Sequence, residues 1–114
     1  MDECIFCKIV EGKIPASVVY EGETVLAFED IQPTAPVHVI LVPKRHVGSM
    51  MDMGDGQREL AADIMEAAVK VARLKGVDET GFRLVINCGP DGGQLVGHLH
   101  MHLLGGRKLT DGMG

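Results

Sequence analysis

Residues 98–104 read His98-Leu99-His100-Met101-His102-Leu103-Leu104, so three histidines alternate with apolar residues. Side chains along a β-strand alternate between the two faces of its sheet. We therefore predict a strand over residues 97–104 with its histidines on one face and its apolar residues on the other, buried face. Residues on one face of a strand lie roughly 6.5 to 7 Å apart, which favours three separate roles over three ligands of one metal.

Length and charge limit what the chain can be. With 114 residues, 46% of them hydrophobic, we expect a single domain over 1–114. The net charge of −5 argues against a nucleic-acid polymer as partner but leaves a single nucleotide open. No apolar run reaches 18 residues and no charged-then-apolar leader follows Met1. We therefore expect no membrane span, no signal peptide and a cytoplasmic location.

The rest of the chain supplies the other elements of an α+β fold. Apolar spacing predicts a short N-terminal helix over about 4–11 and a long helix over about 57–75. Runs rich in β-forming residues predict strands over 17–20, 24–28, 37–42 and 82–88, the first two joined as a hairpin. We expect a five-stranded antiparallel sheet that the long helix covers on one side.

The cysteines point to a reducing compartment. There are three of them, and an odd number fits a secreted disulfide framework poorly. Cys4 and Cys7 form a C-x-x-C motif. A redox motif is expected after a strand of a βαβ unit, and nothing precedes this one. The remaining interpretations of the motif are a metal site or a chance spacing of two cysteines.

The alternating histidines have the form H-φ-H-φ-H-φ-φ, where φ is apolar, and this resembles the signature of the histidine triad (HIT) family. Further segments follow the order and spacing of the short nucleotide-binding branch of that family, so the resemblance covers nearly the whole chain. They are IFCKIV (5–10), FEDIQP (28–33), HVILVPK (38–44) and N-x-x-x-D-G-G-Q (87–94). The resemblance implies a homodimer whose two sheets join, and hydrolysis of purine nucleotide conjugates of the form AMP-X.

The same resemblance implies a catalytic set without a catalytic metal. His100 would be the nucleophile and would carry AMP covalently. His102 would hydrogen-bond a phosphate or bridging oxygen, and His38 would orient the imidazoles. The chemistry is reasonable, because a neutral imidazole is nucleophilic near pH 7 and divides one difficult displacement into two easier ones.

A nucleotide-binding set is implied as well. The glycines of the 87–94 loop let backbone N–H groups approach a phosphate, and we expect an anion nest there. By resemblance, Asp30 would bind both ribose hydroxyls, and Leu95 stands where the branch commonly has a serine, so we expect weaker help to the leaving group. The base would lie among Ile5, Phe6, Ile9, Phe28 and Ile31, and the phosphate near Asn87, Gly93, Gln94 and Leu95.

Some bacterial members of the family hold a structural zinc ion, and this chain has the matching residues Cys4, Cys7, His46 and His98. Two thiolates and two imidazoles complete a closed tetrahedral Zn²⁺ site that leaves no position for water. Such a site would attach the N-terminal helix to the sheet, and it accounts for His98 without a catalytic role.

Two other functions stay open at this point. One is a nucleotide-binding module in which turnover is vestigial and a protein partner binds the surface. The other is a mononuclear zinc hydrolase that uses His100 and His102, since two histidines at i and i+2 can chelate one metal.

Overall fold

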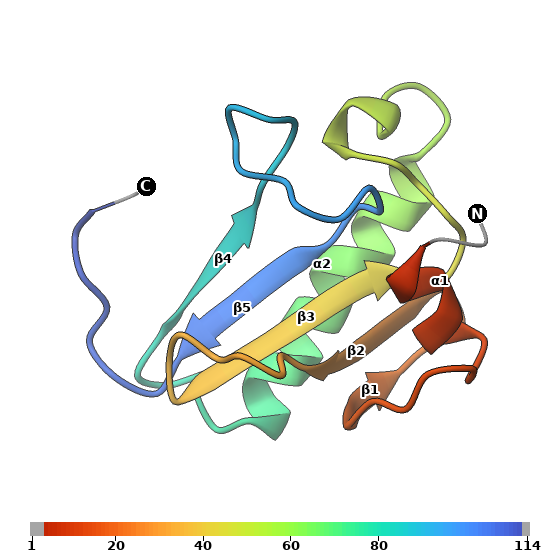
Figure 1. The fold of residues 1–114 in the computed structure, drawn as a ribbon. Coiled ribbons are helices and arrows are strands. Elements are labelled where there is room, and N and C mark those ends of the chain that lie inside the picture. Colours follow the sequence, from red (N-terminus) through yellow and green to blue (C-terminus); the bar gives the residue numbers. More distant parts are fainter. Residues whose placement is uncertain (1–3, 113–114) are drawn as a thin grey trace.

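The computed structural model describes residues 4–112, so the first three and last two residues of the predicted domain lie outside the described residues. The elements run in chain order as follows (Figure 1): α1 Ile5–Val10, β1 Val18–Glu21, β2 Val25–Glu29, β3 Val37–Pro43, the 3₁₀ helix η1 Met50–Asp52, α2 Arg58–Leu74, β4 Phe82–Ile86 and β5 Met101–Gly105.

The strands form one antiparallel sheet in the order β1-β2-β3-β5-β4. β1 and β2 are the expected hairpin, closed by a hydrogen bond of 2.8 Å from Gly22 N to Val25 O. The predicted α+β class, with five antiparallel strands, one long helix and a short N-terminal helix, is confirmed. No helix within residues 4–112 is long and apolar enough to cross a membrane.

One face of the sheet is the main core, and α2 covers it. The apolar residues of α2 recur every three or four positions and so lie on one side of the helix, which packs on β1, β2 and β3. Leu99, Met101 and Leu103 point into this core. The buried residues of α2 are Leu60, Ile64, Ala67, Ala68, Val71 and Ala72.

The opposite face carries a smaller apolar cluster, and α1 lies over that face (Figure 1). Phe6 of α1 meets Phe28 of β2 with ring centroids 5.7 Å apart. In the register between β3 and β5, Ile40 lies opposite His102 and His38 lies opposite Leu104. His38 and His102 are therefore diagonal neighbours on the α1 face, close enough for their side chains to meet.

The last strand begins later than predicted. β5 starts at Met101, so His98 and His100 precede the strand. Pro43, at the end of the neighbouring β3, has no N–H with which to continue the ladder, and Leu99 N donates instead to Val47 O at 2.6 Å. The expectation that one strand holds all three histidines is therefore wrong, although Leu99 and Met101 still point into the α2 core.

Two smaller differences concern the connections. β4 ends at Ile86, not at residue 88, and residues 87–94 form the loop. The sequence analysis also has no counterpart for η1, which a capping box starts: Ser49 accepts from Met51 N, and Asp52 accepts from Ser49 N.

Candidate functional site

His38 has its ring protons fixed by a main-chain donor. The N–H of Thr34 donates to His38 Nδ1 at 3.1 Å, so Nδ1 is an acceptor and Nε2 carries the proton of the neutral ring. His38 Nε2 lies 2.9 Å from Nδ1 of His102 and 3.3 Å from Oδ2 of Asp30. His38 thus donates to His102, which leaves the proton of His102 on its Nε2.

His100 has the opposite tautomer. Its Nδ1 lies 2.8 Å from the carbonyl oxygen of His98, which only accepts, so Nδ1 carries the proton. The lone pair of neutral His100 is therefore on Nε2. The ring centroids of His100 and His102 are 5.1 Å apart, and Phe6 contacts the His100 ring edge-on with centroids 5.0 Å apart. The two neighbouring rings therefore differ at Nε2, which carries a lone pair in His100 and a proton in His102.

Burial favours the neutral forms of His38 and His102. Desolvation lowers the pKa of His38 below its ordinary value, and the Asp30 carboxylate only partly offsets this. Desolvation also lowers the pKa of His102, and the charges of His100 and His38 lower it further, against Asp30. Neutral rings are the forms that the hydrogen bonds described above require.

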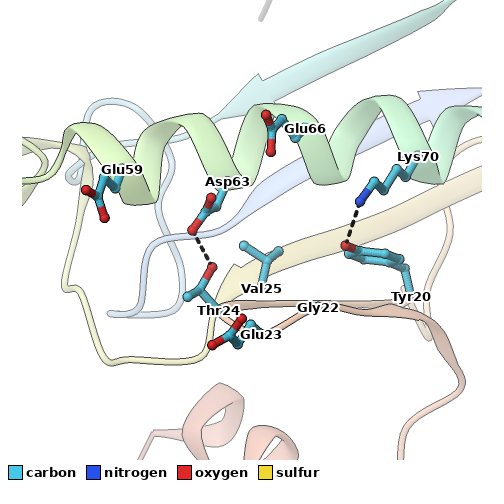
Figure 2. Close-up of a pocket in the computed structure, with 9 residues that line it drawn as sticks. All are labelled: Tyr20, Gly22, Glu23, Thr24, Val25, Glu59, Asp63, Glu66 and Lys70. Atoms are coloured by element: carbon cyan, nitrogen blue, oxygen red, sulfur yellow. Dashed lines mark hydrogen bonds between the residues drawn. The ribbon is translucent and has the colours of Figure 1, made fainter.

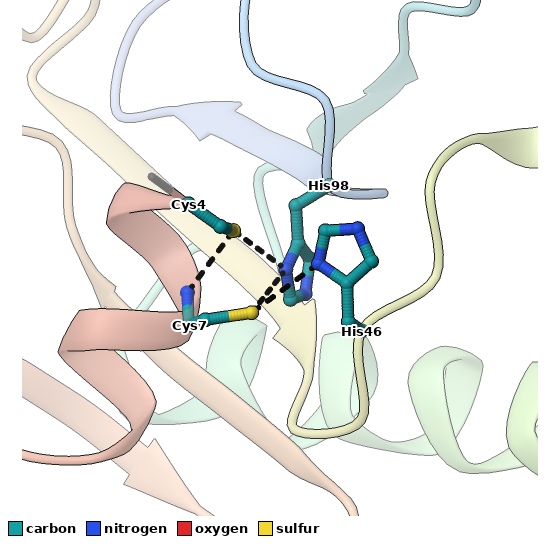
Figure 3. A group of neighbouring side chains, drawn as sticks. All are labelled: Cys4, Cys7, His46 and His98. Atoms are coloured by element: carbon teal, nitrogen blue, oxygen red, sulfur yellow. Dashed lines mark hydrogen bonds between the residues drawn. The ribbon is translucent and has the colours of Figure 1, made fainter. Parts of the chain in front are cut away.

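Four side chains from three segments form a second group (Figure 3). Cys4 and Cys7 lie at the start of α1, His46 in the loop after β3, and His98 before β5. Cys4 Sγ is 3.3 Å from His98 Nδ1, Cys7 Sγ is 3.2 Å from His46 Nδ1, and Cys7 Sγ is 3.5 Å from His98 Nδ1. All four ligand atoms lie within 4.8 Å of one another, so the residues expected to bind zinc do come together.

The chemistry of this group suits a cation. His98 Nε2 donates to the carbonyl of Pro43 at 2.9 Å, so the lone pair on Nδ1 faces the sulfur atoms. Burial, together with the neighbouring Cys4, raises the pKa of the Cys7 thiol to about 11. A thiolate at this position needs a nearby positive charge at neutral pH, which a metal with two sulfur and two nitrogen ligands supplies.

Within residues 4–112, the only other group with the spacing of metal ligands is Asp30, His38 and His102. These three residues form a hydrogen-bonded cluster instead of a metal site. The Nδ1 lone pair of His38 accepts from Thr34 N, and its Nε2 carries a proton toward His102, so His38 has no free lone pair for a metal. His100 belongs to neither group, so this geometry gives no support to a zinc hydrolase that uses His100 and His102.

The 87–94 loop is held by its own hydrogen bonds. Asn87 Nδ2 donates to Gly92 O at 2.7 Å, and Gly93 N donates to Pro90 O at 3.1 Å. Gln94 accepts from Gly89 N at 3.0 Å and donates to Gly48 O and Val96 O at 2.8 and 3.0 Å. These groups keep the loop in shape, and the anion nest stays a prediction.

The residues expected around the base differ in exposure. Phe6 and Phe28 are buried against each other, whereas Ile5 is exposed and Ile9 is half-buried. Ile31 and Leu95 are both 93% exposed, so each presents an apolar side chain that this chain does not cover. Asp30 is half-buried, and its Oδ1 accepts from Gln32 N at 2.7 Å.

A hollow of about 310 Å³ lies on the other side of the sheet, between α2 and the β1–β2 turn (Figure 2). Thr24 donates to Asp63 there at 2.8 Å, and Lys70 reaches the ring of Tyr20. Its carboxylates would repel a phosphate, so the hollow is no candidate for the nucleotide site. The acidic residues that line it are Glu23, Glu59, Asp63 and Glu66.

The structure adds functional contacts that the sequence analysis missed. The main-chain N–H of Thr34 has no signature in the sequence, because any residue other than proline supplies one. The carbonyl groups of Pro43 and His98 also have no signature in the sequence, because every residue has a carbonyl group. Phe6, which we expect beside the base, also packs against His98 and His100, with ring centroids 5.9 and 5.0 Å away.

Comparisons with known proteins show which family the chain resembles in sequence and in fold. A family model described as "HIT domain" matches residues 11–109. The "Purine nucleoside phosphoramidase" of Escherichia coli K12 is 40% identical over 108 residues, 95% of this chain and 91% of that protein. The "14 kDa zinc-binding protein" of Brassica juncea is 44% identical over 110 residues, 95% and 96% of the two chains. A crystal structure of a "HIT family hydrolase" from Legionella pneumophila Philadelphia 1 has a TM-score of 0.95 and 48% identity, with 98% and 100% coverage.

The neutral histidines predict how stability depends on pH. Above the ordinary histidine pKa, His38 and His102 are neutral in both the folded and the unfolded chain. As the pH falls below about 6.5, the unfolded chain takes up these protons first, so the free energy of unfolding should decrease until the lowered pKa values are passed. Urea midpoints at about pH 7.5 and 5.5 measure this. His38→Gln should lose less stability over that interval than the wild type, and an equal loss would contradict the assignment.

Proposed function

The chain belongs to the HIT domain family, and from this premise we propose that it hydrolyses purine nucleotide conjugates of the form AMP-X. The observation that carries the proposal is the hydrogen bond from His100 Nδ1 to the His98 carbonyl, which leaves Nε2 with a free lone pair. The likeness to a purine nucleoside phosphoramidase supports adenosine phosphoramidates or related conjugates as substrates.

In the proposed reaction, Nε2 of His100 attacks the α-phosphorus while the bond from phosphorus to X breaks. His102 Nε2–H faces the reacting group as the donor to a phosphate oxygen or to the bridging atom, and His38 holds it in that tautomer. Water then cleaves the phosphorus–nitrogen bond, which yields AMP and restores His100. A leaving imidazole makes this second step easier than direct attack of water on AMP-X.

The nucleotide would lie on the face that α1 covers. Asp30 would bind the ribose hydroxyls, and the exposed Ile5 and Ile31 would contact the base together with Phe6, Ile9 and Phe28. Asn87, Gly93 and Gln94 would border the phosphate. Leu95 has no hydrogen-bond donor in its side chain, so help to the leaving group would come from His102.

Zinc would be structural in this protein. Cys4, Cys7, His46 and His98 would hold it through two sulfur and two nitrogen atoms, and it would fix α1 to the segment before β5. All four positions would be filled by protein, so the site supplies no water for catalysis. A reducing compartment such as the cytoplasm would keep the cysteines available as ligands.

A homodimer would form through β4. β4 is one of the two edges of the sheet, none of its residues is buried, and α2 packs on β1, β2 and β3. The other edge, β1, is interrupted by a register shift between Val18 and Tyr20, which makes it a poor template for pairing. A second copy added at β4 would pair its free N–H and C=O groups and cover Leu84 and Ile86.

Removing the nucleophile tests the proposed function. His100→Ala should lower kcat/KM for an adenosine phosphoramidate by about 1,000-fold or more, because the variant lacks the nitrogen that forms the proposed bond to phosphorus. The variant should still bind metal, since His100 is not among the four ligands. Undiminished turnover would rule out the mechanism. If the wild type binds AMP tightly but leaves AMP-X intact, the result would favour the alternative function, a nucleotide-binding module with vestigial turnover.

Metal content tests the cysteine and histidine group. Purified wild type should contain about one zinc per chain, and Cys4→Ser should lose most of it and melt at a lower temperature. Cys88→Ser is the matched control, because Cys88 lies outside the group and its loss should leave zinc in place. The assignment would be wrong if wild type purified from rich medium contained no zinc, or if the Cys4→Ser variant retained it.

Sedimentation velocity and hydrogen exchange together test the dimer. We expect a particle of about twice the chain mass, with slow exchange at those β4 amides that point away from β5. The β1 amides that point away from β2 serve as the internal control and should exchange quickly, because that edge stays open. A monomer, or equal exchange at the two edges, would exclude pairing through β4.

A further inference from the structure

Arg107 lies beyond the catalytic residues but reaches the loop that carries the donor to His38. It follows β5 after only Gly106, and its Nη2 donates to the carbonyl of Thr34 at 3.3 Å. The N–H of the same Thr34 donates to His38 Nδ1 at 3.1 Å. One residue, Thr34, is therefore held at its carbonyl by Arg107 while its N–H holds His38.

The turn after β5 packs tightly against this loop, which supports the contact independently. Gly106 has φ +88, and a Cβ added there would lie 2.9 Å from Cβ of Pro36 and 3.3 Å from the Val37 backbone nitrogen. Only glycine accommodates both the positive φ and this close approach. The start of the 106–108 segment and the end of the 30–37 loop thus fit together as one unit.

We propose that Arg107 is a positioning residue, which keeps the Thr34 N–H on Nδ1 of His38 and so holds His38 and His102 in their catalytic tautomers. The hydrogen-bonded chain runs from Arg107 through Thr34 and His38 to His102. The side chain of Thr34 takes no part in it. The effect on rate rests on the proposed function, whereas the effect on tautomers does not.

The consequence of losing the contact follows from the ring chemistry. With the Thr34 N–H displaced, Nδ1 of His38 can carry the proton, and the lone pair on Nε2 then faces the acceptor on His102 and the carboxylate of Asp30. Asp30 by itself still favours a proton on Nε2, so the tautomer should shift partly. Loss of a partner that orients a metal-bound histidine typically costs roughly 10- to 100-fold in activity, and for His38, which lies outside the metal group, we expect a loss at the low end of that range.

The chain offers a matched control for Arg107. Arg83 also donates from Nη2 to a main-chain carbonyl, that of Thr110 at 2.6 Å, but this carbonyl has no contact with His38. Arg83→Met removes a half-buried guanidinium and its bond to the Thr110 carbonyl, and Arg107→Met removes an exposed guanidinium and its bonds to the carbonyls of Thr34 and of the neighbouring Lys108. Arg107→Lys keeps a donor, and Thr34→Ala keeps the main chain, whereas Thr34→Pro removes the N–H itself.

Two-bond ¹H–¹⁵N NMR of histidine-labelled protein reads the ring tautomers directly, and turnover of an adenosine phosphoramidate reads their effect. Arg107→Met and Thr34→Pro should move His38 toward the Nδ1–H tautomer and lower kcat about 10-fold with KM nearly unchanged. Arg107→Lys should restore most of both, while Arg83→Met and Thr34→Ala should match the wild type.

The two readouts separate the proposals. An unchanged His38 tautomer in Arg107→Met overturns the role of Arg107, and an equal shift in Arg83→Met does so too. A tautomer shift in protein that never turns over the phosphoramidate supports the positioning role and rejects the proposed function. Should Thr34→Pro fail to fold, the Arg107 and Arg83 variants still decide.

Discussion

Main-chain groups fix the proton on each buried histidine, and the chemistry of the site depends on this constraint. The Pro43 carbonyl takes the proton of His98, the His98 carbonyl takes that of His100, and the Thr34 N–H occupies the free nitrogen of His38. Main-chain positions are set by the sheet and its loops, so the tautomers are a property of the fold. Neighbouring rings can thereby hold different roles: His100 presents a lone pair, and His102 presents a proton.

His98 connects the two groups of side chains. Its ring turns toward Cys4 and Cys7, while its carbonyl holds the ring of His100. Phe6 lies between the two cysteines in the sequence and packs on the rings of both His98 and His100. A metal that fixes the cysteines and His98 would hold in place α1, Phe6 and the His98 carbonyl, which contact the ring of His100, the proposed nucleophile. A structural site can therefore support catalysis without touching substrate.

Much of this arrangement could be predicted from sequence. The spacing of Leu60, Ile64 and Val71 predicts α2. The alternation of histidines with Leu99, Met101 and Leu103 predicts that the apolar residues face the core and that the histidines face the opposite side of the sheet. The late start of β5 could not be predicted in the same way, because it depends on Pro43 of a different strand lying beside it. The contacts of Thr34, Arg107 and the His98 carbonyl were hidden for a related reason, since main-chain groups are present at every residue.

We propose that Nε2 of His100 forms a bond to phosphorus during turnover, and the catalytic roles of the neighbouring rings depend on this bond. Rapid mixing with an adenosine phosphoramidate, an alkaline quench and peptide mapping by mass spectrometry would locate any adenylate, and comparison with synthetic Nδ1 and Nε2 phosphohistidine standards would identify the nitrogen. We predict an adenylate on His100 at Nε2 that forms and decays at rates compatible with kcat. An adenylate on another residue, a bond to Nδ1, or steady turnover with no adduct at any time would contradict the account.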